Sequence, residues 1–190
     1  MAMANLIEVK ECINNLLKRY NNLPNKEKEC EKKTEEYIRP LLEKIGWDWL
    51  SSEVTPQKKV KGALRITRVD YSFKKRGELR PSFYLEAKRF SDKLTNPDHI
   101  KQALDYGKNS GNRWIILTNF TKWMVFNSNY FDEPEHAILF EFELNECLNN
   151  QEYMSWLLLF SRYQNSSVID DYAKKHKKWK ESEDIEELLT

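Results

Sequence analysis

Two stretches of alternating side chains, separated by a short turn, constrain the fold of this chain more than any other feature. Mainly apolar or aromatic residues alternate with mainly polar ones over 65–74 and again over 82–89. Between them Arg76, Gly77 and Glu78 form a sequence that is typical of a turn. The pattern predicts an antiparallel hairpin of two half-buried strands. Its expected core face carries Thr67, Val69, Tyr71 and Phe73 from the first strand and Phe83, Leu85 and Ala87 from the second.

Three ionisable residues lie on the other face of this predicted hairpin. A hairpin centred near Glu78 places Asp70 opposite Glu86, and Glu86 shares its face with Lys88, two positions on. Directly paired residues have Cβ atoms roughly 4.5–5.5 Å apart, so two carboxylates there can share a hard divalent cation. Such a cation activates water and neutralises charge in phosphodiester cleavage, and Lys88 would stabilise the negative phosphate.

The Glu-x-Lys triplet gives weak support when taken alone, because it occurs three times, at 8–10, 31–33 and 86–88. The first two fall in predicted helices, where residues two apart face different directions. Only the third lies on a predicted strand, beside an apolar face and behind a strand that carries an acid.

Helices are predicted on either side of these strands. Apolar residues recur at helical spacing over 5–20 and from about 27 to 45. Pro40 should kink the second helix or start a fresh turn, and Gly46 should end it. A helix is also expected from Asn96 to about Ser110, stopping at Gly111. The last helices are predicted at 153–163 and 168–189.

Further strands complete the predicted sheet, so we expect an α/β fold with a mixed central β-sheet flanked by helices and extra helices at both ends. The other strands are expected at 54–60, 114–118, 123–127 and 138–143, and the most exposed loop at 127–135. The predicted organisation is an N-terminal helix (1–25), a catalytic core (26–145) and a C-terminal helical extension (146–190).

Gln102 and Tyr106 lie four positions apart on the helix that follows the Glu/Lys strand, and therefore share one face. An amide and a phenol there could contact a phosphate backbone or brace Lys88. Taken alone, such a pair more often reflects packing or a solvated helix face. Trp114, Trp123 and Trp156 sit in apolar patterns and are expected in the core rather than stacked on bases.

Positive charge is concentrated around the hairpin. The segment from Lys58 to Lys93 contains twelve basic and four acidic residues, a net charge of +8 in a chain whose net charge is +1. A basic band of this kind suits phosphate contacts, although a solvated surface hairpin would show it too. The side chains expected to contact DNA are Lys58, Lys59, Lys61, Arg68 and Arg89.

Other classes of site and location have little support. The three cysteines and three histidines are scattered without zinc-ligand spacing, which disfavours a zinc site or a Ser-His-Asp triad. No apolar run approaches the roughly 18 residues of a membrane helix. The first ten residues lack a signal-peptide pattern, so we expect a cytoplasmic protein without a membrane partner.

In three segments the sequence resembles the PD-(D/E)xK nucleases, and more narrowly the N-terminal nuclease domain of type I restriction enzyme R subunits and of fused type IIG restriction-modification enzymes. The first segment runs from Glu31 and Thr34 through Ile38-Arg39-Pro40-Leu41-Leu42 to Asp48. The second runs from Asp70 to Glu86-Ala87-Lys88. The third begins with Gln102 and Tyr106 and includes the 114–119 and 122–127 strand pair.

This resemblance implies a restriction-endonuclease-like core and Mg²⁺-dependent hydrolysis of DNA phosphodiesters, with Mn²⁺ as a substitute metal. Under it, Asp70 and Glu86 are metal ligands, Lys88 is the catalytic lysine, and Gln102 and Tyr106 form an accessory motif. Family members often add a helix glutamate near the metal. Glu31 matches that pattern best, with Glu35 one turn on as its substitute, although either could be a solvated helix acid.

The resemblance also implies partners. Double-stranded DNA is the expected substrate, and methyltransferase, specificity or helicase subunits or domains are the expected associates. The chain itself shows no Gly-rich phosphate loop and no methyl-donor motif. Two other functions stay open: a non-catalytic DNA-binding or assembly module on a nuclease scaffold, and a DNA-repair nuclease. The intact Asp70, Glu86 and Lys88 set argues against the first, and nothing in the sequence separates the second.

Overall fold

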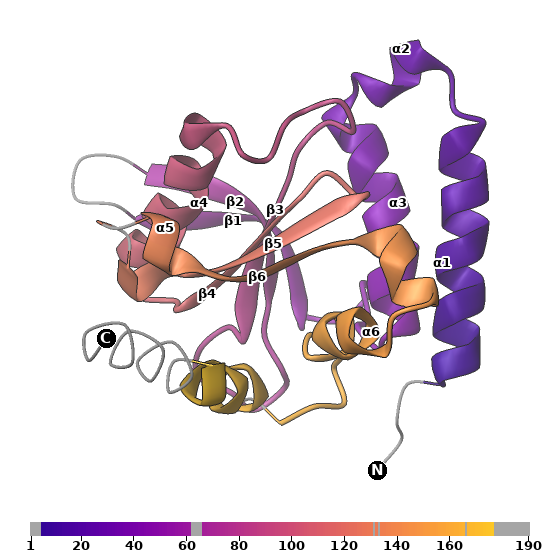
Figure 1. The fold of residues 1–190 in the computed structure, drawn as a ribbon. Helices are drawn as coiled ribbons and strands as arrows, with labels where there is room; N and C mark the ends of the chain where they lie inside the picture. Colours follow the sequence, from indigo (N-terminus) through magenta and orange to yellow (C-terminus); the bar gives the residue numbers. More distant parts are fainter. Residues whose placement is uncertain (1–4, 62–65, 131, 133, 166, 177–190) are drawn as a thin grey trace, which may run out of the picture.

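A computed structural model describes residues 5–61, 66–130, 132, 134–165 and 167–176, with the backbone alone at 60–61 and 66–67. Six strands form one mixed sheet in the order β1-β2-β3-β4-β5-β6 (Figure 1). Neighbouring strands are antiparallel except β3 and β4, which are parallel. The strands are β1 (Val54–Lys61), β2 (Ile66–Phe73), β3 (Phe83–Ala87), β4 (Trp114–Thr118), β5 (Lys122–Asn127) and β6 (Ile138–Glu143).

Helices cover both faces of the sheet, which confirms the predicted α/β fold. On one face, α3 lies between the strands and α1, and α6 lies near their lower ends (Figure 1). On the other face, α4 and α5 close a second, smaller core. The helices are α1 (Leu6–Asn21), α2 (Asn25–Lys28), α3 (Glu31–Lys44), α4 (Pro97–Ser110), α5 (Pro134–Ala137) and α6 (Gln151–Leu158), with short 3₁₀ turns η1 (Ser128–Tyr130) and η2 (Leu144–Leu148).

The central strands β3 and β4 are buried along their whole length, as expected for a parallel pair that is covered on both faces. The connection between them is α4, which the predicted caps delimit. Asn96 accepts a hydrogen bond from the Asp98 N–H at its start, and Gly111 adopts φ 66° at its end. Trp114 and Trp123 are buried and Trp156 stacks on Phe140, which confirms their expected place in the core.

Two helix predictions were wrong in extent. The helix expected from about 27 starts at Glu31, because the Cys30 N–H bonds to Glu27 and its backbone is extended. It continues past Pro40 to Lys44, and Gly46 follows its end at φ 106°.

The apolar helix expected at 153–163 ends at Leu158. Tertiary contacts stop it, since Trp47 Nε1 donates to the Phe160 carbonyl at 2.7 Å and the Arg162 N–H donates to Ile45 at 3.0 Å. Residues 168–176 are helical as expected, and the rest of the predicted 168–189 helix lies outside the described residues. The expected loop at 127–135 includes regular structure, because Asn127 ends β5, Ser128 is buried in η1, and α5 begins at Pro134.

The predicted alternation along β2 fails at one point. Tyr71 and Phe73 face the α3 side, but Val69 packs in the α4 core, so it does not share their face. The β1–β2 pairing is interrupted between them, where Gln57 has φ 48° and stands opposite Asp70. This irregularity turns the strand just where the predicted site begins.

No helix in the described part of the chain could span a bilayer.

Candidate active site

Asp70 lies where the ladder between β2 and β3 stops. The last pair of that ladder is Tyr71 with Leu85, and one further step places Asp70 opposite Glu86, in agreement with the predicted centre near Glu78. Beyond this pair the Ala87 N–H of β3 bonds to a side chain of β2 instead of to its backbone: Asp70 Oδ2 accepts it at 2.8 Å. The other oxygen, Oδ1, accepts from Gln57 Nε2 at 3.3 Å. The carboxylate is therefore fixed at a gap between two strands.

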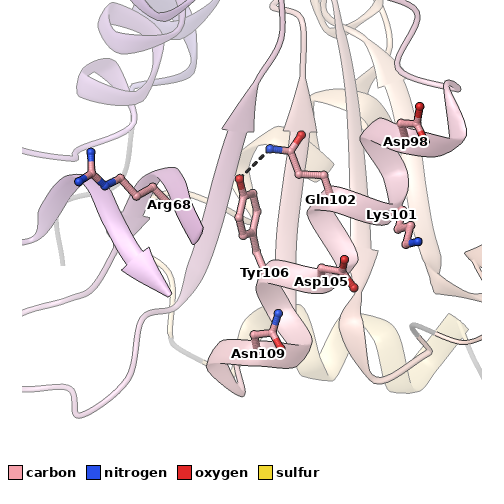
Figure 2. Close-up of a pocket in the computed structure, with 7 residues that line it drawn as sticks. All are labelled: Arg68, Asp98, Lys101, Gln102, Asp105, Tyr106 and Asn109. Atoms are coloured by element: carbon pink, nitrogen blue, oxygen red, sulfur yellow. Dashed lines mark hydrogen bonds between the residues drawn. The ribbon is translucent and has the colours of Figure 1, made fainter. Parts of the chain in front are cut away.

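Glu86, Lys88, Gln102 and Tyr106 form one chain of hydrogen bonds. Lys88 Nζ donates to Glu86 Oε1 at 2.7 Å and to Gln102 Oε1 at 2.9 Å. Gln102 Nε2 in turn donates to the Tyr106 hydroxyl at 2.7 Å (Figure 2). Lys88 is only 6% exposed and Glu86 only 3%. Among the readings of the helix pair, these hydrogen bonds support bracing of the lysine, and Tyr106 also packs in the second core.

Burial and like charge make this site costly to ionise. Burial raises the pKa of Asp70 to about 6, and the negative charges of Glu31 and Glu35 add to the rise against the Ala87 N–H. Burial, followed by the charge of Asp70, raises the pKa of Glu86 to about 8, although the Lys88 ammonium opposes it. Two neighbouring carboxyl groups with raised pKa values are typical of a site that binds a cation.

A divalent cation fits the polar groups of this site. Glu86 Oε2 is buried and has no hydrogen-bond partner, and a buried unpaired carboxylate oxygen is costly. No three Asp, Glu, His or Cys side chains within the described ranges group closely enough to hold an ion by themselves. Mg²⁺ usually takes one or two carboxylates and completes its shell with water and substrate phosphate. Asp70 and Glu86 could hold it in that way.

The two candidate helix acids lie on α3 beside Asp70. Both are half-buried, and both raise the pKa of Asp70 through their charge. Glu35 also accepts a hydrogen bond from the Tyr71 hydroxyl. Burial and this hydrogen bond raise the pKa of Tyr71, so its hydroxyl stays protonated. Glu31 has no such anchor among the described residues. Glu35 is therefore held more firmly than Glu31, although Glu31 matches the sequence pattern better.

The expected DNA-contacting residues are spread around the site. Lys58 and Lys59 are exposed on the edge strand β1, and the Lys61 side chain lies outside the described residues. Arg68 is exposed on β2 and lines a pocket of about 510 Å³ together with α4 residues, among them Gln102 and Tyr106 (Figure 2). Arg89 is exposed and lies 3.9 Å from Glu29, a distant surface ion pair.

Sequence reasoning missed two contributors to this site. Gln57 holds Asp70 from an irregular strand position, and nothing in the local sequence indicates it beyond the preceding Pro56, which disturbs a strand. The strand period predicts Tyr71 in the core, where it is buried, but not that its hydroxyl also reaches Glu35. The sequence does place Tyr71, whose hydroxyl needs a hydrogen-bond partner when buried, directly after the candidate acid Asp70, and this could have indicated a polar contact.

Comparisons with known proteins bear on the fold. No family model matches the chain, and no curated protein matches it either. The fold is similar to part of the cryo-EM structure of a DrdV–DNA complex, with a TM-score of 0.55, 16% identity, and coverage of 87% of this chain and 14% of that chain. It also matches part of the crystal structure of the type IIG restriction endonuclease BpuSI, with a TM-score of 0.43, 17% identity, and coverage of 65% and 14%.

The chain therefore spans about one seventh of each of these proteins. At these identities the likeness shows the fold alone. The mixed six-stranded sheet with helices on both faces is consistent with a restriction-endonuclease-like core.

Proposed function

We propose that this chain is a Mg²⁺-dependent DNA endonuclease domain of the PD-(D/E)xK class, from a restriction enzyme. One observation carries the proposal: a buried lysine is held between Glu86 and Gln102, beside a carboxylate oxygen that has no partner and next to Asp70. The fold likeness to part of DrdV, which was solved with DNA, supports DNA as the substrate. The restriction role rests on the sequence resemblance.

Asp70, Glu86 and Lys88 would have different roles in hydrolysis. A Mg²⁺ ion, or Mn²⁺ in its place, held by Asp70 and Glu86 would supply Lewis-acid chemistry and a water of lowered pKa. The Ala87 N–H and Gln57 fix the orientation of Asp70. Lys88 is placed to donate to the attacking water or to the negative phosphate oxygens.

Gln102 and Tyr106 act on the lysine rather than on the substrate. Gln102 accepts from Lys88 and donates to Tyr106, so the ammonium has a fixed direction. Burial, and then the charge of Glu86, raise the pKa of Tyr106 to about 12, which keeps its hydroxyl protonated. Preorganised donors of this kind cost little reorganisation during the reaction.

Cleavage of supercoiled plasmid DNA with Mg²⁺ tests the proposal. We expect the Lys88→Ala protein to lose cleavage by about 100-fold or more, because the group that stabilises phosphate charge is gone. Lys44→Ala is the matched control, since Lys44 also pairs with a glutamate, Glu8, but on the exposed surface of α1 and α3. It should cleave like the unmodified protein.

Two results would contradict the proposal. One is equal cleavage by the Lys88→Ala and unmodified proteins, which would assign any nuclease activity to another site. The other is the absence of cleavage with any divalent metal, both for the chain alone and with partner subunits. That second result would favour the non-catalytic DNA-binding or assembly module.

A further inference from the structure

Strands β1 and β2 continue as a two-stranded ribbon beyond the end of β3 (Figure 1). Pairing between β2 and β3 ends at Tyr71, whereas pairing between β1 and β2 runs on to Lys61 with Ile66. The ribbon thus consists of 57–61 and 66–70. Val69 packs its base against the α4 core, and Asp70 is the residue that joins it to the candidate active site.

The ribbon is basic and free of acids up to Asp70. Its segments 57–61 and 66–69 contain four basic residues and no acidic one. Lys58, Lys59 and Arg68 are exposed, and none of them forms an ion pair with another described residue. Their charge is therefore available to a partner.

Two of these cations stand directly opposite each other. Lys59 pairs with Arg68 across the ribbon, and like charges in directly opposed positions destabilise a sheet. Cations on exposed strand edges can also serve to prevent aggregation, and beyond the end of β3 both strands of the ribbon are edges. A polyanion that bridges Lys59 and Arg68 would convert the repulsion into attraction.

The distribution of charge over both faces favours a duplex groove. Lys58 and Lys59 are consecutive and therefore project from opposite faces of the ribbon, with Arg68 on the face of Lys59. A single nucleic acid strand would need only one basic face. The major groove of duplex DNA, about 12 Å wide, admits a two-stranded ribbon and has phosphates along both walls.

We propose that the ribbon of 57–61 and 66–70 enters a groove of duplex DNA, with Lys58 and the Lys59–Arg68 pair facing phosphates on its two walls. This rests on the proposed nuclease function and adds to it the element that holds the substrate. Because the ribbon ends at Asp70, a duplex held by it is delivered to Asp70, Glu86 and Lys88. Contacts of this kind fix position and register rather than read bases.

Equilibrium binding measured by fluorescence anisotropy tests the ribbon, using a labelled duplex oligonucleotide and one of its single strands in Mg²⁺. All proteins carry Lys88→Ala so that the DNA stays intact. The test variant adds Lys59→Ala and Arg68→Ala. The matched control adds Arg76→Ala and Arg80→Ala, which remove the same charge from the exposed turn at the far end of β2, about 15 Å or more along the strand.

We expect the test variant to bind the duplex about tenfold or more weakly. The slope of log K against log salt should fall by about 1.8, since each lost phosphate contact contributes about 0.9. The control should change affinity less than about twofold, because rim charges far from the DNA have little effect. Thermal unfolding would confirm that all variants are folded.

Several outcomes would overturn the ribbon proposal. They are no duplex binding by the parent protein, unchanged duplex binding by the test variant, an equal loss in the control, or an equal loss for the single strand. Aggregation of the test variant with normal binding would assign these cations to edge protection. If cleavage by the unmodified protein still depends on Lys88 in any of these cases, the nuclease proposal stands and only the ribbon fails.

Discussion

The ammonium group of Lys88 has two partners, and they contribute differently to its position. Glu86 is its charged neighbour and a proposed metal ligand, whereas Gln102 only directs it. Substitution of a supporting residue around a metal site typically costs 10–100-fold in activity. We therefore expect Gln102→Ala to lower the cleavage rate about tenfold, less than Lys88→Ala does.

Single-turnover cleavage at saturating Mg²⁺ measures this difference. Tyr106→Phe is the graded companion, because it removes the hydroxyl that receives the Gln102 amide and leaves Lys88 in contact with Gln102. Its loss should be smaller than that of Gln102→Ala. A Gln102→Ala rate as low as that of Lys88→Ala would show that the amide does more than direct the lysine.

At this scale the sequence could predict whatever depends on strand period. Asp70, Glu86 and Lys88 follow from alternation and hairpin symmetry, and the observed register agrees with that pairing. The contacts of Gln57 with Asp70 and of Tyr71 with Glu35 could not be predicted in the same way. They depend on a positive φ in β1 and on where α3 lies over β2, which are consequences of tertiary packing.

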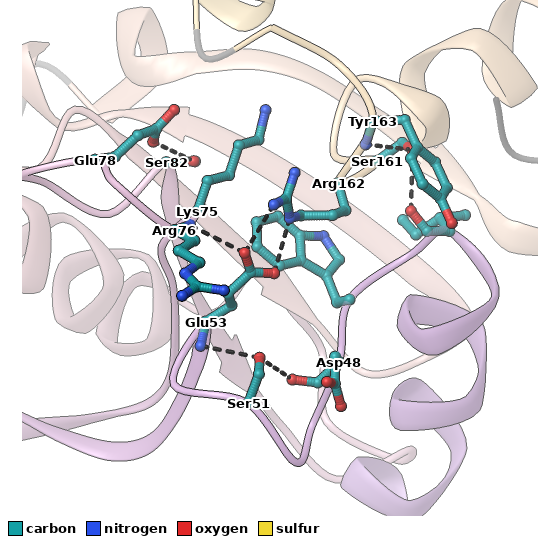
Figure 3. Close-up of polar contacts among 12 residues, drawn as sticks. Asp48, Ser51, Glu53, Lys75, Arg76, Glu78, Ser82, Ser161, Arg162 and Tyr163 are labelled. Carbon is teal, nitrogen blue, oxygen red and sulfur yellow. Dashed lines mark hydrogen bonds and ion pairs between the residues drawn. The ribbon is translucent and has the colours of Figure 1, made fainter. Parts of the chain in front are cut away.

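Among the elements, the C-terminal segment after α6 is joined to the far end of the sheet by a bidentate ion pair (Figure 3). Arg162 Nε and an Nη of the same guanidinium each donate to Glu53 at 2.8 Å, and the Glu53 side chain is only 12% exposed. Because Arg162 is itself about one third exposed, water screens part of this interaction.

Arg162→Ala should therefore lower the free energy of unfolding by about 1–2 kcal/mol, near or below the lower end of the roughly 1.5–3 kcal/mol for hydrogen bonds to charged groups, because water screens the pair. For a chain of this size that is a drop in Tm of about 2–8 °C. Differential scanning calorimetry is the measurement. Lys44→Ala is its control, because the Lys44–Glu8 pair is exposed and should contribute far less. Equal effects of the two substitutions would contradict the view that the Arg162–Glu53 ion pair stabilises the fold.

The same segment shows why helix extents were predicted unevenly. The limits of α4 are local, since a capping Asn and a left-handed Gly lie in its own sequence. The end of α6 is determined by residues distant in the sequence. The Trp47 side chain donates to the Phe160 carbonyl, and the Ile45 carbonyl accepts from the Arg162 N–H. The apolar pattern over 153–163 carries no trace of these partners.

For the whole molecule, the buried acids of the site link folding to pH. The pKa of Asp70 rises from 3.8 to about 6 and that of Glu86 from 4.5 to about 8 on folding. The folded protein therefore binds protons more tightly than the unfolded chain between about pH 4 and pH 8. Stability from these two groups is fully present below that window, and it is lost as the pH rises through it.

Mg²⁺ should offset this loss, because it replaces the protons that Asp70 and Glu86 release. We expect the metal-free protein to melt at a lower temperature at about pH 8 than at about pH 5, and a hundredfold excess of Mg²⁺ over its Kd to restore about 2.7 kcal/mol, but only at the higher pH. Glu86→Gln is the control, since the amide oxygen can still accept from Lys88 but the side chain neither titrates nor attracts a cation. It should flatten the dependence on pH and reduce the Mg²⁺ effect. Thermal melts in EDTA and in Mg²⁺ at the two pH values measure these effects. If Mg²⁺ fails to stabilise the unmodified protein at about pH 8, Asp70 and Glu86 do not bind the metal.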